Sequence, residues 1–189
     1  MRLTALGYYL DFALAPLCAV IALALVPSRE IPGGLAGLAL GFAAWTLAEY
    51  LVHRFIYHRV PYFERLHDAH HAEPDALIGA PPLVGPVSVL LAAAPSILLG
   101  HGFGLGFTAG AMAGYLGYIG VHHWAHQHRG ALGPRLRRLR QHHLKHHASH
   151  GEGNFGVLTG FWDRVFATDV APRGHAPRGG IGPEEPLLT

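Results

Sequence analysis

Four long apolar runs dominate the first two thirds of the chain, and short polar or glycine-rich turns separate them. The runs cover residues 6–26, 35–55, 83–99 and 103–121. A helix of about 20 apolar residues crosses the hydrocarbon core of a bilayer, and the first run would be about 30 Å long as a helix. Asp11 lies within this run, where it could reach the interface, cap a neighbour or act in function. The pattern predicts an all-α integral membrane fold with four transmembrane helices.

Composition agrees with a membrane protein of one domain. The chain has 189 residues, of which 50% are apolar and 14% are charged, whereas about a quarter of residues are charged in soluble proteins. A cleaved signal peptide is the alternative for residues 6–26, but the run is long and carries Tyr8, Tyr9 and Asp11. A lone Cys18 excludes an intrachain disulfide framework. We expect a membrane domain over residues 1–170 and a disordered, Pro- and Gly-rich tail over residues 171–189.

The second run is rich in small residues, including Gly37 and Gly41, which allow close approach of a neighbouring helix. It ends in a polar stretch that contains Glu49, His53 and His58. The two histidines are five positions apart, about 140° around a regular helix, so a straight α-helix cannot aim both at one ion. We therefore expect the helix to end or unwind between them. Glu49 could orient a histidine ring or be a plain interfacial residue.

Basic residues set the predicted orientation. Six of them follow the fourth run: Arg129, Arg135, Arg137, Arg138, Arg140 and Lys145. By the positive-inside rule this segment is cytoplasmic, so an even number of spans places both termini there too. The composition favours a bacterial source and hence the inner membrane. We interpret the arginine run as a solvated face touching anionic headgroups, and we expect no nucleic-acid binding.

Sixteen histidines are the chemically informative residues. Ten of them form four clusters with helical spacing: His53 and His58; His67, His70 and His71; His122 and His126; His143, His146 and His147. Residues three or four apart share one face of a helix, and neutral imidazole is a common metal ligand. A single such cluster is often only a surface patch. Four clusters at the same predicted end of the bundle indicate a metal centre, and ten nitrogens suit two ions of iron, zinc, copper or nickel.

The six remaining histidines are not expected to bind metal. His123 faces about 100° away from His122, so packing or the support of a ligand is expected for it rather than ligation. The others are predicted to be surface residues: His101, His128, His142, His150 and His175. His142 is the least clear of these, since it could replace a neighbour as a ligand.

Several segments, taken together, resemble the fatty acid hydroxylase superfamily of membrane di-iron oxygenases. They are HRFIYH, LHDAHH, GAPP, HHWAH, HHLKHH and NFGVLTGFWDRVFAT, and they lie in order between residues 49 and 168. The resemblance implies that the ten clustered histidines hold two iron ions, with zinc an alternative in a purified sample. It also implies four transmembrane helices capped by a cytoplasmic, histidine-rich helical region. Glu49, Asn154 and Asp163 are weaker candidates for supporting the ligands.

The resemblance further implies a lipid hydroxylase that uses O2 and electrons from a cytochrome b5 or ferredoxin type donor. No fused cytochrome b5 domain is present in the sequence, so we expect a separate donor. A carotenoid or sterol hydroxylase or desaturase is the nearest alternative. Metal transport, metal storage and a structural zinc protein are the rivals from other classes, although transporters place their ligands near the middle of the bilayer rather than at one edge.

Overall fold

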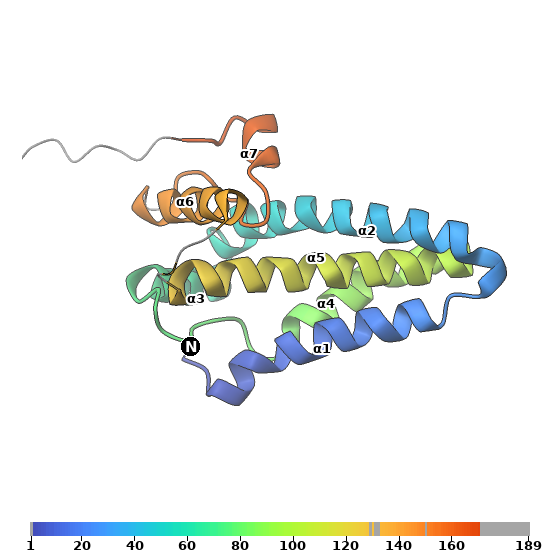
Figure 1. Ribbon diagram of the computed structural model, residues 1–189. Helices are drawn as coiled ribbons and strands as arrows, with labels where there is room; N and C mark the ends of the chain where they lie inside the picture. The colour runs from blue at the N-terminus through green and yellow to red at the C-terminus, as the bar shows by residue number, and fades with distance from the viewer. Residues whose placement is uncertain (1, 129, 131–132, 150, 171–189) are drawn as a thin grey trace, which may run out of the picture.

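Four helical segments run side by side in the computed structural model and form a bundle, which a smaller set of helices caps at one end (Figure 1). The structure describes residues 2–128, 130, 133–149 and 151–170. The bundle consists of α1 (Ala5–Ala24), α2 (Ile31–Leu51), α4 (Val84–Ala93) with the 3-10 helix η3 (Ala94–Leu99), and α5 (His101–Gln127). The cap consists of α3 (Pro61–Ala72), α6 (Pro134–Ala148) and α7 (Phe161–Val165). A 3-10 turn, η1 (Ser28–Glu30), and a π-helix, η2 (Val52–Tyr57), flank α2. The four apolar runs are thus confirmed as helices.

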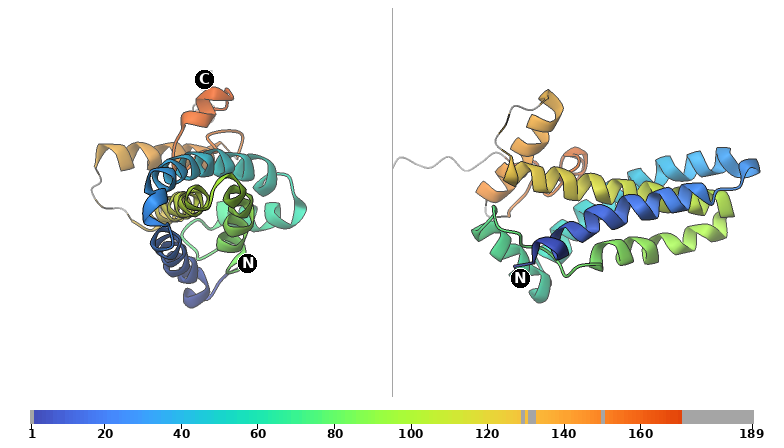
Figure 2. Two further views of the ribbon diagram at one scale, coloured as in Figure 1. Left: turned by 90° about the vertical axis from the view of Figure 1, so that its right-hand side faces the viewer. Right: turned by 60° about the horizontal axis from the view of Figure 1, so that its bottom comes forward.

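The cap gathers segments that are far apart in the sequence. Figure 2 shows α3, α6, α7 and the start of α1 at the same end of the bundle, together with the last turns of α2 and α5. The opposite end carries the short turns between α1 and α2 and between η3 and α5 (Figure 1). The segments that carry the four histidine clusters therefore meet at one end of the bundle, as predicted from the order of the apolar runs.

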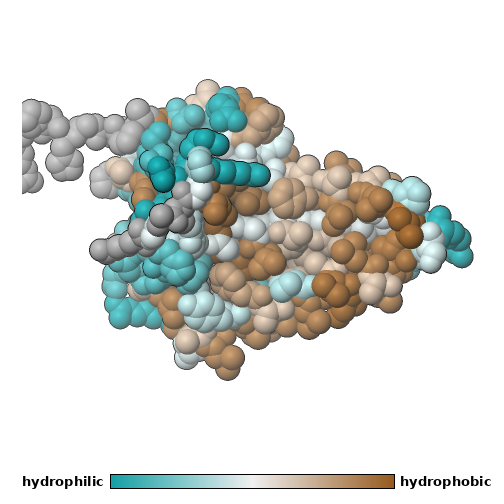
Figure 3. All heavy atoms as spheres, viewed as in Figure 1, coloured by the Kyte–Doolittle hydropathy of each residue, from teal (hydrophilic) through white to brown (hydrophobic). Residues whose placement is uncertain are grey.

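The bundle presents an apolar surface, and the cap presents a polar one (Figure 3). Two helical stretches, Ala5–Ala24 and Ser28–Tyr57, are long and apolar enough to cross a membrane. Val84–Leu99 is apolar but shorter. Large apolar side chains face outward on it, such as Leu98, which is 89% exposed. α5 packs against α1, α2 and α4, and most of its buried residues are glycine and alanine.

Close backbone contact joins α2 to α5. A Cβ added to Gly41 would lie 2.1 Å from the carbonyl oxygen of Phe107, and one added to Gly110 would lie 2.1 Å from that of Leu38. Real side chains cannot approach backbone oxygens so closely, so only glycine fits at these two positions. The predicted role of the small residues in helix approach is confirmed.

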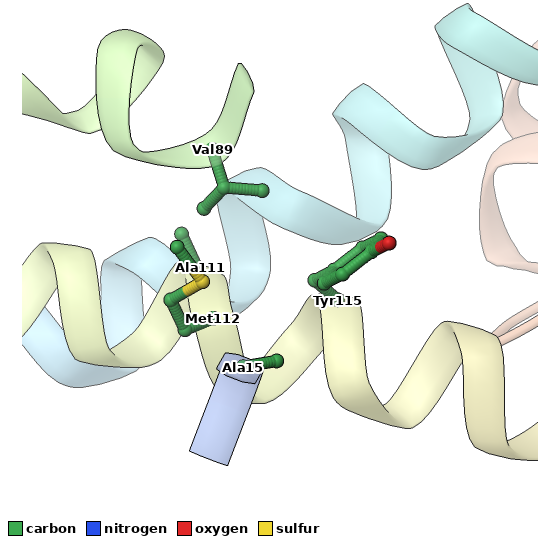
Figure 4. Close-up of a cluster of buried hydrophobic side chains, with 5 residues drawn as sticks. All are labelled: Ala15, Val89, Ala111, Met112 and Tyr115. Atoms are coloured by element: carbon green, nitrogen blue, oxygen red, sulfur yellow. The ribbon is translucent and has the colours of Figure 1, made fainter. Parts of the chain in front are cut away.

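A cluster of buried side chains links α1, α4 and α5 in the middle of the bundle. It contains Ala15, Val89, Ala111, Met112 and Tyr115 (Figure 4). The Tyr115 hydroxyl donates to Asp11 at 2.5 Å, and Asp11 also accepts from the backbone N–H of Leu83 at 3.3 Å. Asp11 thus ties the start of α4 to α1 and α5, and it also lines the cavity described below.

The third apolar run is not one regular helix. Pro86 lies in the first turn of α4, where its missing N–H breaks no hydrogen bond, and the α-helix changes to the 3-10 helix η3 before Pro95. Gly100, at φ 132°, then separates η3 from α5. Glycine adopts this left-handed conformation without steric cost.

Candidate metal centre

A π-helix solves the spacing problem of His53 and His58. The regular α-helix α2 ends at Leu51, and the wider turns of η2 follow over Val52–Tyr57. In a π-helix, residues five apart lie one above the other. The rings of His53 and His58 accordingly stack, with centroids 5.3 Å apart and planes at 19°. The regular α-helix thus ends before His53, and the wider π-helix that follows it ends at Tyr57. The expected end of the helix between the two histidines is confirmed, whereas its widening was not predicted.

Three further segments bring the other predicted histidines to the same place. α3 carries one triplet, α6 carries the other, and the last turn of α5 carries the remaining pair. On each helix the i, i+3 or i, i+4 spacing gives one inward face. The structure brings all ten together; their assignment as ligands is a proposal developed below.

Four of the ten form one group around His53. Each of its members offers a ring nitrogen within 4.8 Å of those of the others: His53, His58, His67 and His146. The Nε2 atoms of His53 and His67 are 3.0 Å apart, and those of His58 and His146 are 3.2 Å apart. We call this set the His53 group.

Five others form a second group around His143, defined by the same 4.8 Å limit: His70, His122, His126, His143 and His147. The Nε2 atom of His143 lies 2.8 Å from that of His126 and 3.2 Å from that of His147. We call this set the His143 group.

His71 lies between the two groups. Its Nε2 atom is 3.1 Å from the Nε2 atoms of both His67 and His146, which places it with the His53 group. Its ring stacks on His147 of the His143 group, with centroids 4.1 Å apart. Counting His71, each group has five imidazoles, enough for one ion apiece.

Two backbone carbonyls fix the orientation of two rings in the His53 group. His53 Nδ1 donates to the carbonyl oxygen of Phe155 at 2.5 Å, and His146 Nδ1 donates to that of Gly153 at 2.7 Å. A carbonyl can only accept, so each of these neutral rings carries its proton on Nδ1 and presents a bare lone pair at Nε2.

Two facing nitrogens that both lack a proton cannot form a hydrogen bond with each other, but both can bind one metal ion. Nitrogens about 2.1 Å from one ion lie roughly 3.0 to 3.4 Å from each other, which is the spacing of the facing Nε2 atoms. Burial lowers the pKa of His70 and of His146 to about 3, and neighbouring rings act in the same direction. Both are therefore neutral at physiological pH, as metal ligation requires. The donor set fits nitrogen-binding transition metals.

Asp163 organises the loop that supplies the carbonyls. It is fully buried, and its Oδ1 accepts from Phe155 N and from Thr168 Oγ1, both at 2.8 Å. Its Oδ2 accepts from Gly156 N and from His142 Nε2, both at 2.9 Å. Burial alone would raise the pKa of Asp163, but the hydrogen bonds led by that from His142 hold it below its usual value. Asp163 therefore supports His53 through the backbone, without touching it.

His142 was predicted to be a surface residue, and this was wrong. Its side chain is 14% exposed and pairs with Asp163. The pairing depends on α7 folding back onto α6, which no local spacing reveals.

Asn154 and Glu49 also act on this loop. Asn154 has φ 56°, a left-handed conformation that asparagine tolerates, and its side chain exchanges two hydrogen bonds with the backbone of Val170. Glu49 Oε1 accepts from the backbone N–H groups of Val157 and Leu158. Glu49 is 4% exposed, so neither suggested role, orienting a ring or lying at the interface, describes its observed contacts.

The other described histidines lie apart from the two groups. His123 Nδ1 is 3.1 Å from the Tyr8 hydroxyl, and its ring packs on Tyr9 and Phe12, in agreement with the predicted packing role. His101 and His128 are exposed, as predicted. His150 and His175 lie outside the described residues, as does the predicted tail.

An apolar cavity of about 490 Å³ runs from the histidines into the bundle. At the cap, His67, His70 and His122 line this cavity. Residues of α1, α2, α4 and α5 form its walls farther into the bundle. A separate polar groove reaches the centre from the outside of the cap, where Arg54, His58, Glu64 and Asp68 are among its lining residues. The centre thus has an apolar side and a polar side.

Comparison with known proteins places the chain in a family. The profile of the fatty acid hydroxylase family matches residues 38–168, so the chain belongs to that family. It is 31% identical to the fatty acid 2-hydroxylase of Macaca fascicularis, over 79% of this chain and 43% of the relative.

The chain is also similar to fungal and plant hydroxylases. The ceramide very long chain fatty acid hydroxylase of Schizosaccharomyces pombe is 32% identical, over 69% of this chain and 41% of the relative. A dihydroceramide fatty acyl 2-hydroxylase of Arabidopsis thaliana is 30% identical, over 69% of this chain and 59% of the relative. The chain therefore spans less than half the length of the animal and fungal relatives.

A solved structure shows the same fold. It is described as full-length scs7p with only the hydroxylase domain visible, and it superimposes with a TM-score of 0.69 at 24% identity. The match covers 87% of this chain and 67% of the other.

Proposed function

We propose that the protein is a membrane-bound di-iron oxygenase that hydroxylates the acyl chain of a lipid. The observation that carries this proposal is the apolar cavity that ends on histidines of both groups. Its volume lies within the range of about 300 to 1,000 Å³ that is usual for small-molecule sites. The names of the relatives favour carbon 2 of the chain as the position attacked.

The ten histidines would hold two iron ions, five to each group. Iron in these groups would supply the redox chemistry that puts one oxygen atom of O2 into a C–H bond and releases the other as water, with two electrons and two protons consumed. The cavity walls would hold the acyl chain and exclude water from it. The carbonyls of Gly153 and Phe155 would keep two rings aimed at the centre. Zinc is the alternative occupant in a purified sample.

We further propose that all four bundle segments cross the membrane and that the cap lies in the cytoplasm, at the bacterial inner membrane. The apolar surface of the bundle supports the first statement (Figure 3). The exposed arginines at the start of α6 support the second. Electrons would come from a separate donor of the cytochrome b5 or ferredoxin type, which would reach the centre from the polar side.

The rival functions fit the site less well. A metal transporter places its ligands near the middle of the spans, whereas here the cavity walls are mostly apolar and the histidines gather at one end. A structural zinc site takes four ligands, fewer than either group offers with His71 counted. A carotenoid or sterol substrate is the nearest alternative, and product analysis separates it from an acyl lipid.

The test is oxygenation in a reconstituted bilayer with ferrous iron, a reductant, a donor protein and 18O-labelled oxygen. Mass spectrometry should find a 2-hydroxyacyl lipid that carries one labelled atom. His146→Ala should abolish the product and lower the iron content, whereas the exposed His101→Ala should change neither. Full product formation by His146→Ala would refute the assignment of the centre. An iron-loaded protein that oxidises carotenoids or sterols but no acyl lipid would refute the substrate.

A further inference from the structure

The two histidine groups differ in the hydrogen bonds that their ring nitrogens make to the surrounding protein. In the His53 group, His53 and His146 each donate an N–H to a backbone carbonyl, at 2.5 and 2.7 Å. In the His143 group, both ring nitrogens of His70 and the Nδ1 atom of His143 are buried with no hydrogen-bond partner. Among the described histidines of the two groups, the carbonyl anchors thus belong to one group and the buried ring nitrogens without a partner to the other.

A partner behind a ligating histidine changes how strongly it binds. The donated hydrogen bond fixes the tautomer and the ring orientation, and it makes the ligating nitrogen more basic. Loss of one such partner typically costs about 10- to 100-fold in metal affinity. In the other group, a metal ion bound to one nitrogen of His70 would leave the second nitrogen buried and unsatisfied.

The anchors of the His53 group are also rigidly held. Asp163 accepts four hydrogen bonds and fixes Phe155 and Gly156 by their backbone N–H groups. Asn154, between the two anchoring carbonyls, is pinned by its two bonds to Val170. The carbonyls of Gly153 and Phe155 therefore keep their positions when the rings are free of metal.

We infer that the two sites of the centre are unequal, and that the His53 group binds its ion at least about tenfold more tightly than the His143 group. This inference rests on the proposed metal centre. Asp163 is a positioning residue of the tighter site. The His143 group also supplies His70 and His122, two of the three histidines that line the cavity. The cavity therefore meets more histidines of the weaker site than of the tighter one.

Equilibrium titration of the metal-free protein with Co(II) in detergent tests the inference. The visible absorption of Co(II) bound to nitrogen reports each ion, and competition with a chelator of known affinity sets the scale. Equilibrium is needed because His58 borders the polar groove, so exchange rates would report solvent access as well as affinity. Wild-type protein should bind two ions in steps separated by at least about tenfold. Two ions bound with equal affinity would overturn the inference.

A matched pair of variants assigns the steps. His58 and His126 are both partly buried and belong to different groups. His126→Ala should weaken the second step and leave the tight one, whereas His58→Ala should weaken the tight step. The opposite assignment would overturn the inference.

Asp163→Asn tests the positioning role. Asparagine places an N–H₂ group against donors that now meet a carboxylate oxygen, so the loop should loosen. The tight step should weaken about tenfold or more, with the weak step unchanged. Thr168→Val, which removes one of the four bonds to Asp163, is the milder variant should Asp163→Asn not fold. A change confined to the weak step in either variant would refute the role.

The titration uses no substrate, oxygen or electron donor, so it is separable from the proposed function. A protein with two unequal sites that hydroxylates no lipid would keep this inference and lose the function. A protein that hydroxylates lipid but binds its two ions with equal affinity would keep the proposed function and refute this inference.

Discussion

Acid should destabilise the metal-free protein strongly, because its central histidines are neutral when folded and bind protons when unfolded. Burial lowers the pKa of His70 and of His146 to about 3, and the two side chains are at most 5% exposed. The pKa of histidine in an unfolded chain is about 6.5. The stability that these rings contribute is therefore fully present above about pH 6.5 and is lost as the pH falls from there toward 3.

The magnitude follows from linkage. At pH 5 an unfolded ring is almost fully protonated, because its pKa lies about 1.5 units above the pH, while the folded ring has bound almost no proton. At about 1.4 kcal/mol per unit, each ring costs about 2 kcal/mol. The two together cost about 4 kcal/mol, a large part of the roughly 5 to 15 kcal/mol that stabilises a typical domain. Burial lowers the pKa of His67, of His143 and of His147 too, which adds to the loss.

The assay is denaturant unfolding of metal-free protein in detergent, followed by far-ultraviolet circular dichroism between pH 8 and pH 5. His70→Gln removes one titrating ring and should make the pH dependence shallower by about 2 kcal/mol. His101→Gln, at an exposed position, should leave it unchanged. An unfolding free energy that is flat from pH 8 to pH 5 would refute the reasoning.

Three further predictions concern the backbone. Gly41→Val should separate α2 from α5, since an added Cβ meets the Phe107 carbonyl oxygen at 2.1 Å, and should lower the melting temperature sharply; an unchanged value would contradict the close packing. Asn154→Ala should destabilise the protein more than Asn154→Gly, because alanine pays about 1 kcal/mol or more for φ 56° while both lose the bonds to Val170; equal unfolding free energies would argue against strain. Leu83→Gly should cost little or stabilise, because Leu83 holds φ 73° and is 44% exposed; a large loss of stability would show that its side chain matters.

The helices and their histidine faces were predictable because they follow from local periodicity. The apolar runs became α1, α2, α4 with η3, and α5. The i, i+3 and i, i+4 spacings in α3, α5 and α6 put imidazoles on single faces whatever the rest of the chain does. Convergence of the faces then required only a topology that returns to the same end of the bundle.

The support around the histidines could not be predicted, because it is made by contacts across long sequence distances. Glu49 reaches the N–H groups of Val157 and Leu158, more than one hundred positions away. His53 is held by a carbonyl of Phe155, and a carbonyl is present at every position, so no residue type marks it. Asp163 was only a weaker candidate for supporting the ligands, and its partner His142 was predicted to be a surface residue.

The π-helix η2 has a consequence for how the chain tolerates length changes. A π turn is an α-helix that holds one residue too many, so deleting a single residue between His53 and His58 would let the α-helix continue with the pair four apart and still on one side. The residues after His58 would then keep their orientation, because the deletion removes the extra residue of the π turn and no other. The π turn therefore lets this segment lose one codon and still present both histidines on the same side.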